Sequence, residues 1–219
     1  SRVLYGARVS LSIGILGVLL TLFLGVLLGG LAGYVGGLLD RAVQRAIEVL
    51  QSLPALPLWM ALSAALPVSW SSIRVYFGIT IILSFLGWPA LARQVRGKFL
   101  SLREEDFVVS ARMLGASKMR VIFKHMLPSF NSHLIATATL AVPGMILGET
   151  ALSFLGIGLR PPVVSWGVLM QQAQNYQAIV LTPWLLIPGL FVVLTVMAFN
   201  LLGDGLRDAV DPYSTGGQS

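Results

Sequence analysis

The sequence predicts an all-α, polytopic membrane protein, and its composition and its apolar segments both indicate this class. Hydrophobic residues make up 56% of the 219 residues, charged residues make up 11%, and the mean hydropathy is +0.82. Soluble domains usually carry about 25% charged residues, so a chain this apolar needs the bilayer as part of its solvent. Five apolar segments have close to the ~20 residues that a membrane-spanning helix requires. They cover residues 11–34, 46–66, 75–92, 134–154 and 183–202.

Lysine and arginine are unevenly distributed between these segments, and this predicts the orientation. Arg41 and Arg45 lie between the first two spans, and Arg207 follows the fifth. The connection 93–128 holds the densest group: Arg93, Arg96, Lys98, Arg103, Arg112, Lys118, Arg120 and Lys124. The positive-inside rule places these regions and the C-terminus on the cytoplasmic side of the membrane, with residues 156–182 as an extracytoplasmic loop. It also accounts for the net charge of +6 better than nucleic-acid binding does.

The topology predicts one more span ahead of residue 1. Five spans with a cytoplasmic C-terminus leave Ser1 outside, and the sequence does not start with a signal peptide. We therefore expect residues 1–219 to form a single transmembrane domain that has six spans in the complete protein.

Metal and thiol chemistry are not expected. The sequence contains no cysteine, which excludes disulfides and thiolate ligands. His125 and His133 do not have a metal-binding spacing. We expect no catalytic residue, no metal site and no cofactor in this chain.

Four glycines follow each other at intervals of four residues near the end of the first span: Gly25, Gly29, Gly33 and Gly37. On a helix such residues share one face and allow two backbones to approach closely. Packing within the chain and a contact between subunits both remain open as interpretations.

Within the connection 93–128, residues 102–128 predict two short helices separated by a turn. Acidic residues up to Asp106 precede an apolar run, which indicates a helix from about Asp106 to Leu114. Gly115 is expected to end it, and Ser117 to cap a second helix that Pro128 ends. A connection this long usually has a function. It is either an interfacial helix pair on anionic lipid or a docking element for a soluble cytoplasmic partner.

Two further features lie near the opposite side of the membrane. Ser165 is expected to cap a short helix reaching about Gln174, with Trp166 and Tyr176 at the membrane interface. Glu149 falls near the end of the fourth span, where an ionisable group is costly. It is interpreted as a pathway or gate residue, as a buried hydrogen-bonding anchor for the next loop, or as a group exposed at the outer interface.

The docking segment resembles the Glu-Ala-Ala loop of bacterial ABC importer permeases. Ala111, Gly115, Leu127 and Pro128 match its pattern with the expected spacing. The sequence departs from the pattern at its glutamate, its first alanine and its isoleucine, which are replaced by Val109, Ser110 and His125. Further stretches resemble permeases of the dipeptide and oligopeptide C type, some of which carry nickel complexes. These stretches are 6–11, 33–45, 148–158, 161–167 and 200–212.

The resemblance implies the type I permease fold of ABC importers and a location in a prokaryotic plasma membrane. It also implies that the chain pairs with a second, homologous permease. Two ABC ATPase subunits with bound ATP and Mg, and an extracytoplasmic binding protein, complete the implied importer. ATP hydrolysis then belongs to the partners, because Gly97-Lys98 lacks the remainder of a Walker A motif. The residues implied in ATPase coupling are Ser110, Ala111, Arg112, Met113, Leu114, Gly115, Ala116, Lys118, Leu127 and Pro128.

Because Val109 replaces the glutamate, we expect docking by apolar contact around Met113, Leu114 and Ala116. Arg112 and Lys118 either pair with acidic residues of the partner or are simply solvated. Two other functions stay open: a proton-coupled carrier that uses Glu149, and a membrane scaffold that transports nothing. A carrier would more often show internal repeats, and kinked helices with an intramembrane acid fit a scaffold poorly.

Overall fold

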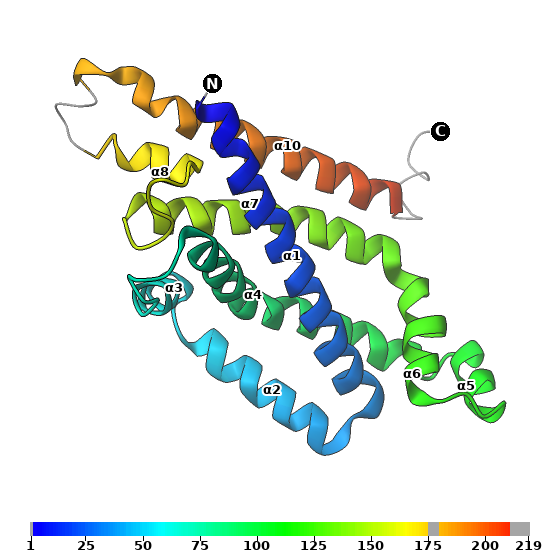
Figure 1. Cartoon of the computed structure of the whole chain (residues 1–219). Coiled ribbons are helices and arrows are strands. Elements are labelled where there is room, and N and C mark those ends of the chain that lie inside the picture. The colour runs from blue at the N-terminus through cyan, green and yellow to red at the C-terminus, as the bar shows by residue number, and fades with distance from the viewer. Residues whose placement is uncertain (1, 175–179, 211–219) are drawn as a thin grey trace, which may run out of the picture.

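The computed structural model describes residues 2–174 and 180–210, and the regular elements in this part of the chain are all helical. Four long helices form the body in Figure 1: α1 (Arg2–Val35), α4 (Ser72–Leu102), α7 (Asn131–Phe154) and α10 (Ile187–Val210). The shorter helices are α2 (Gly37–Ser52), α3 (Ala55–Ala64), α5 (Asp106–Met113), α6 (Lys118–Arg120) and α8 (Trp166–Gln171). Three further short helices are not α-helical. The first, η1 (Val121–Met126), is a π-helix, and η2 (Leu127–Phe130) and η3 (Pro183–Leu186) are 3-10 helices. The all-α membrane class is confirmed.

Helix α1 lies at the centre of the molecule and packs against both α4 and α7 (Figure 1). Three of the four predicted glycines explain how α1 and α4 come so close. A Cβ atom at Gly29 would lie 2.8 Å from the Cα of Ala92, and one at Gly33 would lie 2.8 Å from the carbonyl oxygen of Arg96. A Cβ at Gly25 would lie 2.8 Å from the side chain of Leu91. These glycines therefore serve packing within the chain.

Gly37 does not belong to this stripe, contrary to the prediction. It is the first residue of α2, it has a φ of +64°, and a Cβ there would meet nothing within 4 Å. The four-residue spacing fails at this point because α1 ends at Val35. Gly36, with a φ of +68°, and Gly37 form the turn into α2, where the left-handed conformation favours glycine.

The second predicted span, 46–66, is wrong as a single helix. The chain forms α2 and α3 instead, which meet at an angle of 89°. Pro54 precedes α3 and forces Leu53 into an extended conformation, with φ −93° and ψ 139°. Four helices of the described chain are long and apolar enough to cross a membrane, or five if this bent pair counts as one span.

Within the connection 93–128, the end of the second short helix differs from the prediction. Residues 93–102 extend α4, so the break between helices starts at Arg103. Pro128 does not end the second helix, because the chain stays helical from α6 through η1 and η2 into α7. The change from η1 to η2 keeps the helix continuous while its winding changes around the proline.

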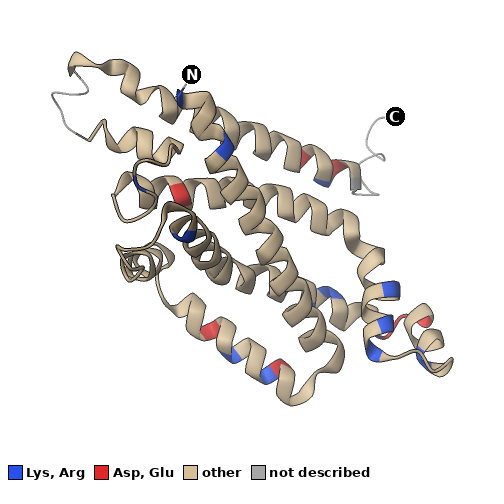
Figure 2. Ribbon diagram, viewed as in Figure 1, with Lys and Arg blue, Asp and Glu red and all other residues tan. Residues whose placement is uncertain are grey.

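Charged side chains gather on α2 and at the corner formed by α5 and α6, as Figure 2 shows. The opposite end of the molecule carries α8 and the start of α1. We call these two regions the α5 end and the α8 end. Tyr176 and the Asp211-Pro212 pair, on which the sequence placed expectations, lie outside the described residues.

Candidate functional site

The turn after α5 forms as expected from the glycine at its centre. Gly115 has a φ of +77°, and its N–H donates to the carbonyl oxygen of Arg112 at 3.0 Å. The next amide, of Ala116, donates to the carbonyl oxygen of Ala111 at 3.1 Å. Ser117 then caps α6, since its hydroxyl accepts a hydrogen bond from the N–H of Arg120. These bonds fix the direction in which the end of α5 points.

One face of α5 is attached to the body of the protein and the other is bare. Val108 and Ala111 are buried against a cluster that includes Phe99 of α4. Met113 and Leu114, by contrast, are 83% and 89% exposed at the tip of the turn. A pair of apolar side chains exposed to this degree on a well-formed turn is typical of a contact surface.

The remaining residues of the predicted coupling set differ in their exposure to solvent. Ser110, Arg112, Lys118 and Pro128 are exposed, whereas Ala116 and Leu127 are half-buried. The apolar contact expected around Ala116 is therefore smaller than that offered by Met113 and Leu114.

A polar cavity of about 530 Å³ separates the end of α1 from the α5 turn. Its wall includes Tyr34, Arg112 and Lys118. It also includes Arg103, whose Nε donates to Glu104 Oε1 at 2.8 Å. The cavity wall thus carries three cations, Arg103, Arg112 and Lys118, and one carboxylate, Glu104, which pairs with Arg103. The wall beside the exposed tip is therefore basic.

At the α8 end, Glu149 is completely buried and bonded to serines from different parts of the chain. Ser10 of α1 donates its hydroxyl to Glu149 Oε2 at 3.0 Å. Ser153, one turn further along α7, donates to Oε1 at 2.8 Å. Both oxygens of the carboxyl group therefore have a donor within the chain.

The same serines also hold the loop that follows α7. The Ser10 hydroxyl accepts from the N–H of Trp166 at 3.1 Å, and the Ser153 hydroxyl accepts from the N–H of Leu159 at 3.0 Å. Ser165 caps α8 as predicted, by accepting from the N–H of Val168 at 3.2 Å. We call Ser10, Glu149, Ser153 and Ser165 the carboxyl–serine cluster. It has the geometry of an anchor, and Glu149 has no exposed surface with which to line a pathway in this conformation.

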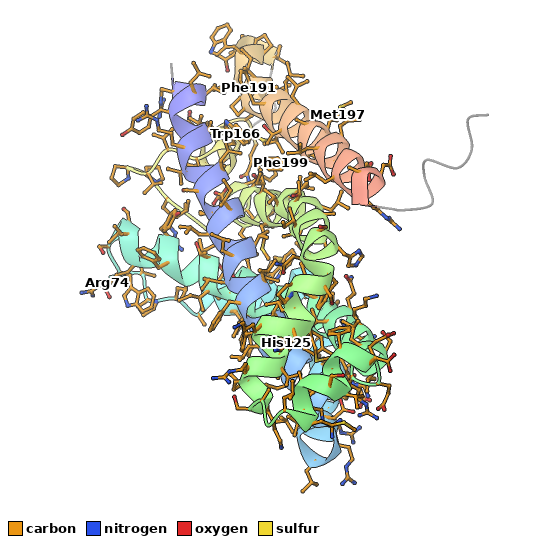
Figure 3. All side chains as sticks on the ribbon, turned by 90° about the vertical axis from the view of Figure 1, so that its right-hand side faces the viewer. Arg74, His125, Trp166, Phe191, Met197 and Phe199 are labelled. Atoms are coloured by element: carbon orange, nitrogen blue, oxygen red, sulfur yellow. The ribbon has the colours of Figure 1, made fainter. Side chains whose placement is uncertain are left out.

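Trp166 is part of this packed region and not an interfacial residue, contrary to the prediction. It is only 1% exposed, and its Nε1 donates to the carbonyl oxygen of Val3 at 3.1 Å. Its ring centroid lies 6.5 Å from that of Phe191 on α10, and Figure 3 shows both residues beside α1. The indole N–H finds a backbone acceptor inside the protein, so it needs no water.

An ion pair joins Asp40 of α2 to Arg96 of α4, and the sequence alone does not predict it. The Arg96 guanidinium donates two bonds to this carboxylate, Nε to Oδ1 at 2.5 Å and Nη2 to Oδ2 at 2.6 Å. This bidentate pair braces α2 against α4. The sequence offered only a weak signal, an acidic residue within an otherwise basic connection.

Within the described residues, no group of three histidine, aspartate or glutamate side chains is placed to hold a metal ion.

Comparison with known proteins agrees with the resemblance. Residues 25–214 match the family described as binding-protein-dependent transport system inner membrane component. The chain is 37% identical over 212 residues to the oligopeptide transport system permease protein OppC of Bacillus subtilis, a match that covers 96% of this chain and 67% of that protein. It is 40% identical over 217 residues to the glutathione transport system permease protein GsiD of Escherichia coli, covering 99% of this chain and 69% of that protein.

These similarities support neither the proton-coupled carrier nor the scaffold. Since the family match covers most of the chain, and since the helices are those of a multi-pass membrane protein, the chain belongs to the inner-membrane components of binding-protein-dependent transport systems and is a permease subunit of an ABC importer.

Proposed function

We propose that this permease imports peptides or similar small solutes, together with a second, homologous permease, two ABC ATPase subunits and an extracytoplasmic binding protein. Its relatives are named for oligopeptide and glutathione transport, and the family description names binding-protein dependence. The ATPase subunits bind ATP and Mg and carry out hydrolysis, so the present chain acts mechanically.

The exposed tip of the α5 turn is the observation that supports coupling. Met113 and Leu114 stand 83% and 89% exposed beyond a turn that Gly115 and Ser117 hold in place. The tip would fit an apolar groove on an ATPase subunit, with Arg112 and Lys118 beside it to meet acidic residues. Closure of the ATPase pair would then displace α5 and, through Val108 and Ala111, the body of the permease.

The proposed orientation places the α5 end in the cytoplasm of a prokaryotic inner membrane and the α8 end outside. Lysine and arginine concentrate at the α5–α6 corner (Figure 2), as the positive-inside rule requires of a cytoplasmic side. Residues 93–128 are then the coupling region, and residues 156–182 form the extracytoplasmic loop on which the binding protein would dock.

The coupling role is tested by the substitution Gly115→Val in the assembled importer. A β-branched residue at a φ of +77° costs about 1–2 kcal/mol locally and redirects the tip. ATP-dependent peptide uptake should be abolished, while membrane insertion and the amount of permease stay unchanged. Normal uptake by this variant would overturn the coupling role.

Gly205→Val provides the matched control. Gly205 lies in α10, and a Cβ there would meet nothing within 4 Å, so uptake should persist. A second experiment distinguishes an ATP-driven importer from a proton-coupled carrier. Peptide uptake into proteoliposomes is measured after the proton gradient has been collapsed. An ATP-driven importer should continue to take up peptide, whereas a carrier should stop.

A further inference from the structure

A hollow lined by both polar and apolar side chains lies between α4 and α7, away from both the coupling tip and the carboxyl–serine cluster. It consists of two adjoining cavities. One, of about 490 Å³, extends from Thr21 of α1 to Thr137 of α7, and the other, of about 890 Å³, extends from Lys98 to Ser129 at the α5 end. Gln94 and His133 line both cavities, so the two lie side by side. We call this space the α4–α7 hollow.

The hollow exists because α4 and α7 both pack on α1 and diverge from each other beyond it. Residues of α1 between Val18 and Leu22 form its floor. Several residues of α4 line the hollow, among them Gly87, Gln94 and Ser101. These three follow one another at intervals of seven positions, which places them on one helix face. Small residues keep this face open, since a Cβ at Gly97 would meet nothing within 4 Å.

The two faces of α7 line spaces of different polarity. His133 and Thr137 face the hollow. The other face, which includes Ile135 and Thr139, lines an apolar groove of about 560 Å³ beside α1 and α10. Polar side chains such as Gln94 and His133 in membrane-spanning helices are costly unless they face protein or water, so the hollow side is the side suited to water.

The charge in the hollow has one sign. Among the described residues, the ionisable side chains that line it are all basic: Arg93, Lys98, His133 and Arg207. Nearby cations on other faces are neutralised by carboxylates, Arg96 by Asp40 and Arg103 by Glu104. A low-dielectric cleft lined by one sign of charge concentrates solutes of the opposite sign.

We propose that the α4–α7 hollow is this chain's wall of the translocation route at the α5 end, and that its basic side chains favour solutes with a free carboxylate. The proposal rests on the peptide-importer function proposed above and adds the wall and its chemistry. The volumes of both cavities fall in the range of about 300–1,000 Å³ that small-molecule sites occupy.

Water access is tested with single cysteines, for which the chain is suited because it has none of its own. Thr137→Cys places a thiol in the hollow, and Thr139→Cys places one at a similar depth on the apolar face of the same helix. The full importer, in inside-out vesicles, is treated with the charged reagent methanethiosulfonate ethylsulfonate, and labelling is measured on this chain.

The Thr137→Cys thiol should react at least roughly tenfold faster than the Thr139→Cys thiol, because a thiolate forms in water and not in lipid. When the labelled importer is then reconstituted into proteoliposomes, its modification should also block peptide uptake. Equal rates, or labelling of Thr137→Cys without loss of uptake, would overturn the proposal. Wild-type importer that takes up no peptide, with Thr137→Cys still labelled, would instead overturn the proposed function.

The charge preference is tested with Lys98→Gln and pairs of peptides that end in a free carboxylate or an amide. The ratio of carboxylate to amide uptake should fall roughly three- to tenfold, as expected for one charge at a partly hydrated site. Arg41→Gln is the matched control, since Arg41 is an exposed cation on α2, outside the residues that line the hollow. An unchanged ratio in Lys98→Gln would overturn the preference for carboxylates.

Discussion

The α8 end and the α5 end of the molecule satisfy their chemistry in opposite ways. At the α8 end, the buried carboxyl group of Glu149 and the amides of Leu159 and Trp166 find partners among serines of the same chain. At the α5 end, Met113 and Leu114 are almost fully exposed on a turn whose own backbone bonds are complete. The first region is closed within the chain, and the second presents a surface to something else.

This difference indicates which parts of a transporter subunit move as one body. A cluster that joins α1, α7 and α8 through buried hydrogen bonds resists local change, because breaking it exposes several polar groups at once. The α5 turn is attached to the body of the protein through the apolar face that includes Val108 and Ala111. Force applied at its tip would therefore pass into the body without having to break the closed end.

The largest effect is expected from Glu149→Leu, which removes the centre of the carboxyl–serine cluster. The hydroxyls of Ser10 and Ser153 would then lack their acceptor, and a buried unsatisfied donor costs about 1–3 kcal/mol each. The thermal midpoint of the assembled importer should fall strongly, and protease should cut the loop after α7 more readily. Glu149→Gln keeps an acceptor oxygen and should lose less. Equal stability of Glu149→Leu and wild type would show that the cluster is not an anchor.

A smaller loss of stability is expected from Gly29→Ala, which tests whether the close contact between α1 and α4 also stabilises the fold. The added methyl group would meet the backbone of Ala92, which cannot swing aside as a side chain would. Forcing the helices apart should cost about 1–3 kcal/mol, measured as a lower thermal midpoint. Gly205→Ala adds the same atom where nothing lies within 4 Å and should change little. If both variants behave alike, the close approach does not limit stability.

The features of the fold that the sequence predicts are local, and those that it does not predict depend on contacts or bends formed in three dimensions. The long apolar helices and the turn at Gly115 follow from local composition and spacing, and so does the serine cap of α8. Of the two serine partners of Glu149, Ser153 is one helical turn away, but Ser10 lies 139 residues earlier, and nothing local in the sequence joins Ser10 to Glu149. The bend between α2 and α3 was missed because the apolar content of 46–66 outweighed Pro54. Gly37 continued a numerical pattern although its helix had already ended.

A modest effect is expected from Asp40→Asn, which weakens the brace between α2 and α4. The side chains of Asp40 and Arg96 are 18% and 27% exposed, so their pair is partly shielded from water. Its loss should cost roughly 1 kcal/mol, near the upper end for ion pairs that water still reaches. Glu48→Gln breaks the Arg45–Glu48 pair, whose side chains are 60–81% exposed, and should leave the thermal midpoint unchanged. A larger loss in Glu48→Gln than in Asp40→Asn would contradict this ranking.

The smallest effect on stability, and the sharpest test of the comparison, is expected from Leu114→Asp. Leu114 is 89% exposed and lies beyond the end of α5, so a carboxylate there meets water and disturbs no packing. The thermal midpoint of the permease should shift by less than about 0.5 kcal/mol in equivalent free energy. Capture of the ATPase subunit and ATP-dependent uptake should nevertheless be lost, because an apolar groove rejects an unpaired charge. Leu38→Asp, at a leucine that is 78% exposed on α2 and outside the coupling set, is the control for charge alone and should keep both. If Leu114→Asp retained the ATPase, the bare tip of α5 would have to be explained by contact with lipid, as the interfacial interpretation of this segment holds.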